Sequence, residues 1–494
     1  MLPYYQFLKQ FSDNLHQLFT KTNNIDQLST QRGLDKEMWS CIMKDNPLSV
    51  AIPTEFGGRG VQTKECLGIL AAAAYESLPL SLTFGINIAL FLEPLAKYGG
   101  ECKAKIFNDF LTHKSMGGLM ITEPEHGTDA LHMQTSFTPT ENGYHLSGQK
   151  HWQGLTGLAD FWIVAAREKS EDGKLSRDVD FFVVDNANPE QQIQVTEYYK
   201  NLGLYMIPYG RNLIDIDVPA DQKLIKHSSG IKMMLDILHR SRLQFAGMGM
   251  GFIQRLLDET LAHCTTRKVG SQKLIELDNV RYQLSRIQAA FTLCSGMCAN
   301  SVAKSSIDHD LSDMGLEANC TKAFLTDLMQ ESAQIAVQLA GANGYKLDTV
   351  VGRSILDSRA FQIFEGANEL LYTQVAEAAL KQMRVAKAES LAAFLIEASY
   401  TQKSAPLFKD LLRFNVSGVL KQRQQVAIGK VIARLVCFQY VQDITEKGFR
   451  EDLYASTKLH IEMDIKELLC DLEDYNNADI VEDYKADSDW LAFV

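Results

Sequence analysis

Apolar and polar positions follow a helical spacing at both ends of the chain and alternate in the middle. From residue 1 to about residue 114 apolar residues recur at helical spacing, and the stretches 69–75 and 86–98 are rich in residues that favour helix. From about residue 118 to residue 220 apolar and polar residues alternate, which indicates β-strands. From about residue 227 the helical spacing returns. The pattern therefore predicts a helical region, a β region and a second helical region.

The middle region contains short apolar stretches separated by turn residues, including Glu141-Asn142-Gly143 and Glu171-Asp172-Gly173. The predicted strands are 119–122, 134–138, 144–147, 161–167, 180–184, 193–198 and 213–218. Because no helical stretch lies between these strands, we expect a small antiparallel sandwich or barrel.

The second helical region, 227–383, is long enough for four long helices, which would pack as a bundle. Further helices are expected at about 406–412, 418–440 and 456–472, and the acidic tail from residue 473 is expected to be loosely ordered. The predicted fold is mainly α with a central β domain and an extra C-terminal helical region. The predicted domains are 1–117 (N-terminal helical), 118–222 (central β), 223–384 (C-terminal four-helix) and 385–494 (additional helical region with an acidic tail).

Composition limits the classes of function. Of the 494 residues, 46% are hydrophobic and 22% are charged, which fits a soluble globular protein. The net charge of −12 argues against binding to nucleic acid or to an anionic membrane surface, since both need basic patches. The nine cysteines are scattered and show neither a CxxC pair nor zinc-ligand spacing. We therefore expect reduced cysteines and no metal site.

The sequence also lacks the pattern of a targeting or membrane-spanning segment. The first 24 residues have no basic stretch followed by an apolar core and are poor in arginine, so neither a secretory signal nor a mitochondrial presequence is expected. The most apolar stretch, 67–92, is interrupted by Glu76 and Pro79, which leaves pieces too short to cross a bilayer. We expect buried helices there, no membrane span, and a cytoplasmic protein.

Two clusters of residues are candidates for chemistry. In one, Glu365 is followed by Gly366 and preceded by Phe361, Ile363 and Phe364. A carboxylate in apolar surroundings has a raised pKa and can act as a base, whereas a Glu-Gly pair standing alone is more often a solvated turn. The other cluster is ITEPEHGTD at 121–129, which begins at the end of a predicted strand.

The motifs of the chain, in their order, resemble those of the acyl-CoA dehydrogenase superfamily. The matching segments are IPTEFGGRG, MITEPEHGTD, GYHLSGQKHWQGLTGLADFWIVAARE, RSRLQFAGMGMG, TRKVG, QLAGANGY and RAFQIFEGANE, and together they span about residues 50–383. The resemblance implies an N-terminal helical domain, a central β domain and a C-terminal four-helix domain. It also implies FAD bound between domains and across a subunit boundary, in a homodimer or homotetramer.

The resemblance further implies an oxidoreductase acting on CH–CH groups. Glu365 matches the family's catalytic base, which takes the α-proton of an acyl thioester while FAD takes the β-hydride, giving a trans-2-enoyl thioester. Because that α-proton is only weakly acidic, such a site must desolvate the base and stabilise the developing enolate. The implied partners are an acyl-CoA or acyl-carrier-protein thioester, and electron-transfer flavoprotein or another electron acceptor.

The resemblance also carries over sets of site residues. Thr122 and Thr128 match positions that contact flavin, and Trp152 matches the aromatic residue beside the isoalloxazine ring, although alone it would be a core aromatic. Arg267 and Gln338 match residues that reach the FAD pyrophosphate of a partner subunit, although alone Arg267 would be a surface arginine. The full cofactor set is Met120, Ile121, Thr122, Gly127, Thr128, Trp152, Gly154, Arg267, Gln338, Gly341, Asn343, Gly344, Ala367 and Glu369. The substrate set is Thr128, Ser241, Arg242, Phe364 and Gly366. For Arg242 we expect a structural role in the first place.

This sequence departs from the family's pattern at several positions. Gly154 and Ala367 stand where the family often has threonine, Gly270 stands where it has phenylalanine, and Leu356-Asp357 stands where it has Arg-Asp. Each lost hydroxyl removes a hydrogen bond worth roughly 1 kcal/mol, so weaker flavin retention is expected. In some branches the base lies on the preceding helix, but the matching residue here is Ser241, which favours Glu365 as the base.

Other functions stay open at this point. The same chemistry on an acyl or aminoacyl group held by a carrier protein is one alternative, for which residues 385–494 would offer a docking face. A flavin-poor, non-catalytic assembly subunit is another alternative, and it would explain the departures from the family pattern. An oxidase or flavin monooxygenase on the same scaffold is a third.

Overall fold

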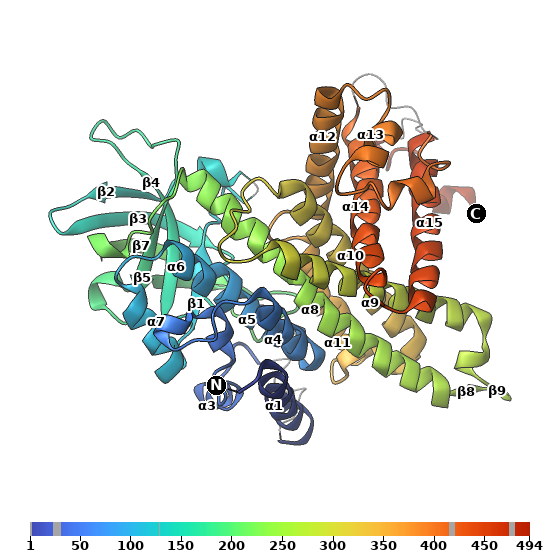
Figure 1. Cartoon of the computed structure of the whole chain (residues 1–494), viewed down its shortest axis with the longest axis horizontal. Coiled ribbons are helices and arrows are strands. Elements are labelled where there is room, and N and C mark those ends of the chain that lie inside the picture. The colour runs from blue at the N-terminus through green and yellow to red at the C-terminus, as the bar shows by residue number, and fades with distance from the viewer. Residues whose placement is uncertain (1, 23–30, 128, 414–419, 474–479) are drawn as a thin grey trace.

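The chain was analysed as a computed structural model, which describes residues 2–22, 31–127, 129–413, 420–473 and 480–494. A β domain lies at one end of the molecule, N-terminal helices lie beside it, and a helical bundle forms the other end (Figure 1). The long helix α8 (Gly230–Thr266) runs from the β domain through the centre into the bundle (Figure 1). This arrangement brings all three parts together along one helix.

The N-terminal region is helical, as predicted. Its elements are α1 (Tyr4–Gln17), η1 (Leu18–Thr22), α3 (Lys36–Ile42), η2 (Pro47–Ala51), η3 (Thr54–Phe56), α4 (Thr63–Glu76), α5 (Leu78–Asn87), η4 (Ile88–Leu92), α6 (Glu93–Tyr98) and α7 (Lys103–Thr112). The expectation that Pro79 breaks the apolar stretch was wrong. Ser77 caps α5 by accepting the Leu80 N–H, and Pro79 stands in the first helical turn, where its missing N–H is tolerated.

One helical stretch, Leu78–Tyr98, is consequently long and apolar enough to cross a membrane. It runs without interruption through α5, η4 and α6. However, 94% of its most apolar window is buried inside the fold, so it is placed as a core helix.

The β domain contains all seven predicted strands. They are β1 (Gly117–Met120), β2 (Ser136–Pro139), β3 (Gly143–His151), β4 (Phe161–Glu168), β5 (Asp180–Asp185), β6 (Gln194–Tyr198) and β7 (Gly210–Pro219). The sheet order is β1-β4-β2-β3-β7-β6, and β5 also pairs with β4. The expectation of a purely antiparallel domain was wrong, because β4 runs parallel to both β1 and β2. The chain returns across the domain before β4 and inserts that strand between two earlier ones, which alternation cannot reveal.

The bundle is built from long helices that follow the β domain. Its elements are α8 (Gly230–Thr266), the hairpin β8 (Lys268–Val269) and β9 (Gln272–Lys273), η8 (Leu274–Glu276), α9 (Asp278–Lys304), α10 (Gly315–Ala340), η9 (Gly341–Tyr345), α11 (Val350–Arg359), η10 (Ala360–Gln362) and α12 (Asn368–Ala386). The start of α8 is tied to the β domain, because the Asp178 carboxylate accepts the N–H groups of Gly230 and Ile231.

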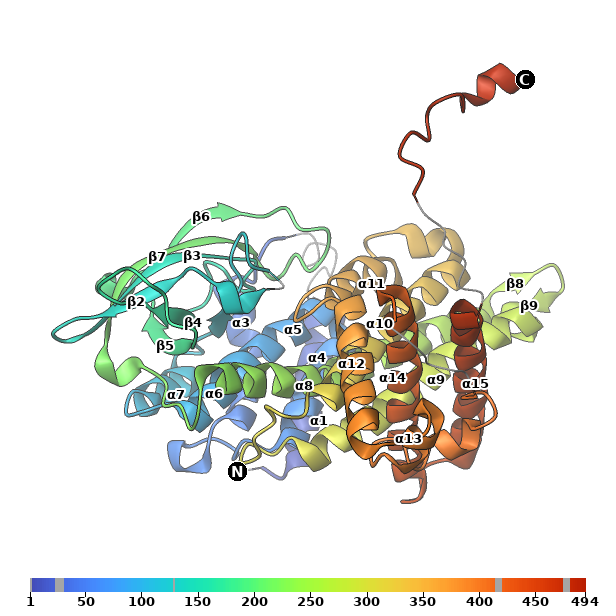
Figure 2. The same ribbon diagram turned by 90° about the horizontal axis from the view of Figure 1, so that it is seen from above.

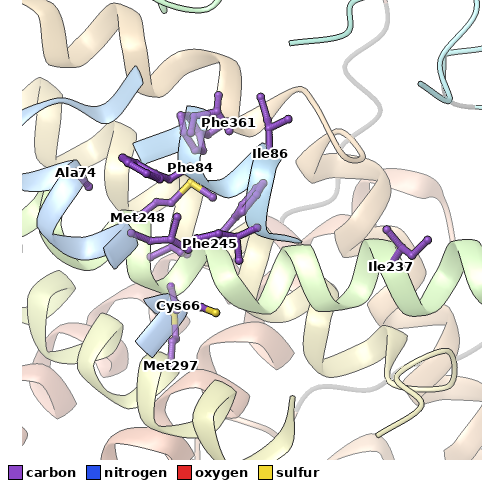
Figure 3. Close-up of a cluster of buried hydrophobic side chains, with 14 of the residues drawn as sticks. Cys66, Ala74, Phe84, Ile86, Ile237, Phe245, Met248, Met297 and Phe361 are labelled. Atoms are coloured by element: carbon purple, nitrogen blue, oxygen red, sulfur yellow. The ribbon is translucent and has the colours of Figure 1, made fainter. Parts of the chain in front are cut away.

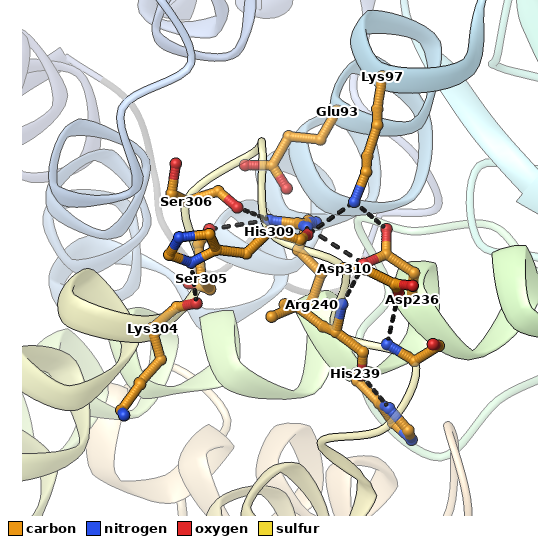
Figure 4. A network of polar contacts seen from close by, with 12 residues as sticks. Glu93, Lys97, Asp236, His239, Arg240, Lys304, Ser305, Ser306, His309 and Asp310 are labelled. Atoms are coloured by element: carbon orange, nitrogen blue, oxygen red, sulfur yellow. Dashed lines mark hydrogen bonds and ion pairs between the residues drawn. The ribbon is translucent and has the colours of Figure 1, made fainter. Parts of the chain in front are cut away.

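A buried polar network fixes the rotation of α8 (Figure 4). Asp236 accepts hydrogen bonds from Lys97 Nζ at 3.0 Å and from Arg240 Nη2 at 3.2 Å. Arg240, which is 2% exposed, also donates to the carbonyls of Ser305 and His309, both at 2.8 Å. A buried ion pair whose donors and acceptors are satisfied in this way specifies one orientation of its helix. Its neighbour Ser241 is thereby placed on another face of α8.

The C-terminal region adds α13 (Leu391–Glu397), η11 (Ala405–Phe408), α14 (Gln422–Thr445), α15 (Glu451–Glu473) and η12 (Trp490–Phe493). Helices α14 and α15 pack alongside α9, α10 and α12 of the bundle (Figures 1 and 2). The helix α13 was not predicted, and the helix expected at 406–412 is only the short turn η11. The start predicted for the helix 418–440 falls outside the described residues. The C-terminal turn η12 lies away from the rest of the protein (Figure 2). We retain the four domain boundaries as a prediction.

Candidate active site

The candidate site centres on residues 362–368, which run from the last residue of η10 to the first residue of α12 and which we call the Glu365 turn. Glu365 has φ +52° and Gly366 has φ +97°, so consecutive residues adopt left-handed backbone conformations. The φ of Gly366 favours glycine, because a residue with a Cβ would be strained there, and that Cβ would also lie 2.8 Å from Leu371 Cδ2. Glutamate prefers a negative φ, so the surrounding structure must hold Glu365 in this conformation. Strained backbone of this kind is common at functional sites.

The Glu365 carboxyl group has two unlike oxygen atoms. Oε1 accepts a hydrogen bond from Ser241 Oγ at 2.9 Å. Oε2 is buried and has no hydrogen-bond partner within the described part of the chain. Burial raises the pKa of Glu365, although the Arg242 guanidinium, the Ser241 hydroxyl and the Lys322 ammonium each act to lower that pKa. A buried acceptor left without a donor is unusual and marks a place where a ligand can supply one.

Aromatic side chains form the apolar wall beside this carboxyl group. Phe361 is fully buried, and its ring centroid lies 4.9 Å from that of Phe364 and 5.7 Å from that of Phe245. Figure 3 shows Phe361 in one buried cluster with Phe245 and Met248 of α8 and Ile86 of α5. Phe361 and Phe364 thus supply the predicted apolar surroundings of Glu365 and account for its desolvation. The same prediction for Ile363 was wrong, because that residue is 59% exposed.

Buried cations hold the backbone of the Glu365 turn. Arg242 Nε donates to the carbonyl of Glu365 at 3.1 Å, and its Nη1 donates to Asn319 Oδ1 at 2.7 Å. Lys322, in α10, is fully buried and donates through Nζ to the carbonyl of Gly366 at 2.7 Å. Burial lowers the pKa of Lys322 to about 7, although the attraction of Glu365 raises it.

Lys322 was missed by the sequence reasoning. The sequence gives no distinct signal for it, because Asn319, Thr321 and Asp327 stand close to Lys322 in α10, and a lysine among such residues is typical of a solvent-facing position.

On the β domain, Trp152 presents its indole ring outward. Its φ is +61°, its N–H donates to the carbonyl of Gly210 at 3.0 Å, and 51% of the residue is exposed. The ring packs at 4.5 Å from that of Tyr199. The alternative that Trp152 is a core aromatic is therefore wrong. Thr122 lies next to it, because its carbonyl accepts the His151 N–H at 3.0 Å.

The loop after β1 is anchored by a buried ion pair that the sequence reasoning also missed. Lys150, fully buried on β3, donates through Nζ to Glu123 Oε1 at 2.8 Å and to the carbonyl of Ile121 at 2.9 Å. Glu123 also accepts the backbone N–H groups of Gln134 and Thr135. Burial lowers the pKa of Lys150 to about 8 against the attraction of Glu123.

The remaining residues of this loop are placed as follows. Met120 is buried at the end of β1, Ile121 is partly buried, and Gly127 is exposed with open space around it. Thr128, predicted for both cofactor and substrate, lies outside the described residues.

Two of the positions that depart from the family pattern, Gly154 and Asp357, have a local explanation in the structure. A Cβ on Gly154 would lie 2.6 Å from Ile86 Cδ1, so Ile86 occupies the space that a threonine would need. Ala367 caps α12 without a side-chain hydrogen bond, and Glu369 is exposed in the first turn of that helix. Asp357 accepts the Leu204 N–H at 2.7 Å and so joins α11 to the β domain.

The residues predicted to reach a partner subunit's cofactor lie far from the Glu365 turn. Arg267 directly follows α8, about 39 Å along the helix axis from Ser241 at 1.5 Å per residue, and it is exposed. Gln338, Gly341 and Asn343 are exposed at the end of α10 and in η9. Gly344 is buried, and a Cβ there would lie 2.6 Å from the carbonyl oxygen of Val337. One chain therefore does not bring the two sets together.

Among the described residues, no group of three or more His, Cys, Asp or Glu side chains could hold a metal ion.

Two models of known domains match consecutive parts of the chain. The model of the acyl-CoA dehydrogenase middle domain matches residues 118–215, and the model of the acyl-CoA dehydrogenase C-terminal domain matches residues 228–380. Together the two matches cover just over half of the chain. The chain belongs to the acyl-CoA dehydrogenase family. The predicted family and its predicted fold class are confirmed.

The relatives of this acyl-CoA dehydrogenase family member are distant. It is 23% identical over 378 residues to the very long-chain specific acyl-CoA dehydrogenase of human mitochondria, covering 75% of this chain and 57% of that protein's length. Among solved structures, an acyl-CoA dehydrogenase with FAD from Bacillus anthracis has a TM-score of 0.75 at 17% identity, covering 95% of this chain and 86% of that one. The prolyl acyl carrier protein oxidase AnaB has a TM-score of 0.69 at 18% identity, covering 76% of this chain and 98% of that one. At these identities the solved structures establish the fold alone.

Proposed function

We propose that this protein is an FAD-dependent acyl-thioester dehydrogenase in which Glu365 is the catalytic base. The observation that carries the proposal is the buried Oε2 atom of Glu365, which has no partner among the described residues and belongs to a carboxyl group of raised pKa. Burial makes this carboxylate a stronger base than one in water, as removal of a weakly acidic α-proton requires. The product is a trans-2-enoyl thioester.

The residues present fit FAD. Trp152 offers an outward aromatic face for a flat ring system, and Thr122 lies beside it in a loop anchored by the Glu123–Lys150 pair. FAD held there would supply an acceptor for the hydride that leaves the β-carbon of the substrate. The exposed positions Arg267 and Gln338 would hold the pyrophosphate of a cofactor bound mainly to a second copy of the chain. This supports a homodimer or homotetramer as the active form.

The residues around Glu365 have different roles in the proposed reaction. Ser241 donates to Oε1 and so leaves Oε2 free to receive the α-proton of the thioester. Arg242 holds the carbonyl of Glu365 and Lys322 holds that of Gly366, which keeps the carboxyl group oriented. The Phe245, Phe361 and Phe364 rings exclude water from the reacting carbons.

We further propose that the acyl group of the substrate is carried by coenzyme A. The matched domains are named for acyl-CoA dehydrogenases, and so is the human relative. The resemblance of the fold to a prolyl acyl carrier protein oxidase keeps a carrier-bound acyl or aminoacyl substrate as the second candidate. Electron-transfer flavoprotein is the proposed acceptor.

Anaerobic mixing of the purified protein with a panel of acyl-CoA thioesters tests the proposal. We expect bound FAD and bleaching of its absorbance, and we expect Glu365→Gln to bleach about 100 to 10,000 times more slowly, the usual contribution of a general base. Glu259→Gln, an exposed glutamate of α8, is the matched control and should behave as the parent protein.

The same assay separates the alternatives. Equal rates for Glu365→Gln and the parent would remove Glu365 as the base. A protein that neither contains nor takes up FAD would favour the non-catalytic assembly subunit. Faster bleaching by carrier-bound thioesters than by matched acyl-CoA would favour the second substrate, and oxygen consumption during turnover would reveal an oxidase.

A further inference from the structure

Asp327, on α10, accepts hydrogen bonds from both ends of the Glu365 turn. Gln362 Nε2 and Asn368 Nδ2 each donate to its Oδ1 atom at 2.7 Å. These donors stand three residues before and three residues after Glu365. One carboxylate therefore closes the turn that presents the proposed base.

The Asn368 end of the turn is held by further bonds from α10. Asn368 Oδ1 accepts from Lys322 Nζ at 3.0 Å, and the same ammonium donates to the carbonyl of Gly366 at 2.7 Å. Asn368 is 3% exposed, and Lys322 is fully buried. Because Glu365 has a positive φ, the turn keeps its shape only while these surrounding contacts hold it.

The other oxygen of Asp327 connects the turn to the C-terminal region. Tyr372 OH, on α12, donates to Asp327 Oδ2 at 2.7 Å, and Tyr372 is fully buried. Helix α14 packs directly on this residue, because a Cβ on Gly429 would lie only 2.0 Å from the carbonyl oxygen of Tyr372. Lys430 Nζ, also on α14, lies 5.8 Å from the centroid of the Tyr372 ring.

A second contact joins α14 to the helix that carries Asp327. The Arg434 guanidinium of α14 lies 4.5 Å from the ring centroid of Phe324, which precedes Asp327 by about one turn of α10. Helix α14 thus touches both elements that meet at the hydrogen bond between Tyr372 and Asp327.

We infer that Tyr372 and Asp327 are positioning residues through which α14 of the C-terminal region keeps Glu365 in its reactive orientation. This inference rests on the proposed function of Glu365 and gives the C-terminal region a role in catalysis. Tyr372 and Asp327 act through the turn, whereas Glu365 meets the substrate.

Tyr372→Phe is the decisive variant, because it removes one hydroxyl and leaves the buried ring. We expect the rate of flavin reduction at saturating acyl-CoA to fall about tenfold or more, since the lost bond is made to a charged group. The KM and the FAD content should stay as in the parent protein. Tyr400→Phe is the matched control in the same region, because its hydroxyl donates to Gln382, about 15 Å farther along α12, and this variant should keep the parent rate.

A pH profile separates positioning from general destabilisation. The charged groups that face Glu365 are Arg242 from α8 and Lys322 from α10, and both stay in place in Tyr372→Phe. A loosened turn lets water reach Glu365, so its pKa falls toward the ordinary value. The half-maximal pH of flavin reduction should therefore move to lower pH in Tyr372→Phe and stay constant in Tyr400→Phe.

Gly429→Ala tests α14 itself and should slow flavin reduction in the same way. A parent rate and an unchanged pH profile in Tyr372→Phe would overturn the inference, as would an equal loss in Tyr400→Phe. A slow Tyr372→Phe beside a folded, fully active Gly429→Ala would overturn the part assigned to α14. The parent protein and Glu365→Gln are measured in the same assay. Equal rates for these two would show that the proposed function of Glu365 has failed, and that result would also overturn the inference about Tyr372 and Asp327.

Discussion

Replacing Lys150 with methionine tests whether the buried pair with Glu123 holds the loop after β1. The variant removes a fully buried ammonium and leaves the Glu123 carboxylate, itself 3% exposed, without its cation. Removing one partner of a buried ion pair costs about 3–5 kcal/mol. We expect about 3 kcal/mol here, because the N–H groups of Gln134 and Thr135 still reach the carboxylate.

Hydrogen exchange of the Gln134 and Thr135 amides measures this cost locally. A loss of about 3 kcal/mol corresponds to exchange faster by about 100-fold in Lys150→Met. The double variant Lys150→Met/Glu123→Gln should regain much of the protection, because a neutral amide replaces the unpaired charge. Lys174→Met, which breaks the exposed pair with Asp172, is the control and should leave exchange unchanged.

Two results would refute this reasoning. Exchange in Lys150→Met within about threefold of the parent would show that the pair does not hold the loop, since threefold is under about 1 kcal/mol. Equal exchange in the single and double variants would show that lost packing, and not the unpaired carboxylate, causes the damage.

Two further predictions concern other buried carboxyl groups. Burial raises the pKa of Asp357 to about 6, so Asp357 contributes stability below about pH 4 that is lost as pH rises through 6. Asp357→Asn should therefore be about 2 kcal/mol more stable than the parent at pH 8 and about equal at pH 4, and equal melting temperatures at both values would contradict this. Ser241→Ala removes a hydrogen bond that lowers the pKa of Glu365, so the half-maximal pH of flavin reduction should rise. A profile that stays in place or moves to lower pH would show that the Ser241 hydroxyl does not tune the carboxyl group.

Much of the architecture could be predicted from local patterns. All seven strands of the β domain lie where alternation places them, and the long helices of the bundle lie where the helical spacing returns. The apolar residues around Glu365 also follow from its immediate neighbours, Phe361 and Phe364. These features depend on residues close together in the chain, so a linear pattern is enough to reveal them.

The pairing of strands and the effect of Pro79 could not be predicted in this way. Strand β4 lies between β1 and β2, and its neighbours are chosen by how the whole sheet packs. Pro79 starts a buried helix because Ser77 caps that helix and the surrounding core covers it.

The residues that hold the proposed base in position depend on tertiary structure throughout. Lys322 and Asp327 come from α10, about 40 residues before the Glu365 turn, and Tyr372 is held in place by α14 of the C-terminal region. Local pattern determined where Glu365 stands in the chain and what surrounds it in sequence. Only the packing of α8, α10, α12 and α14 decided which of its oxygen atoms is left free, because hydrogen bonds between distant residues form after the helices meet.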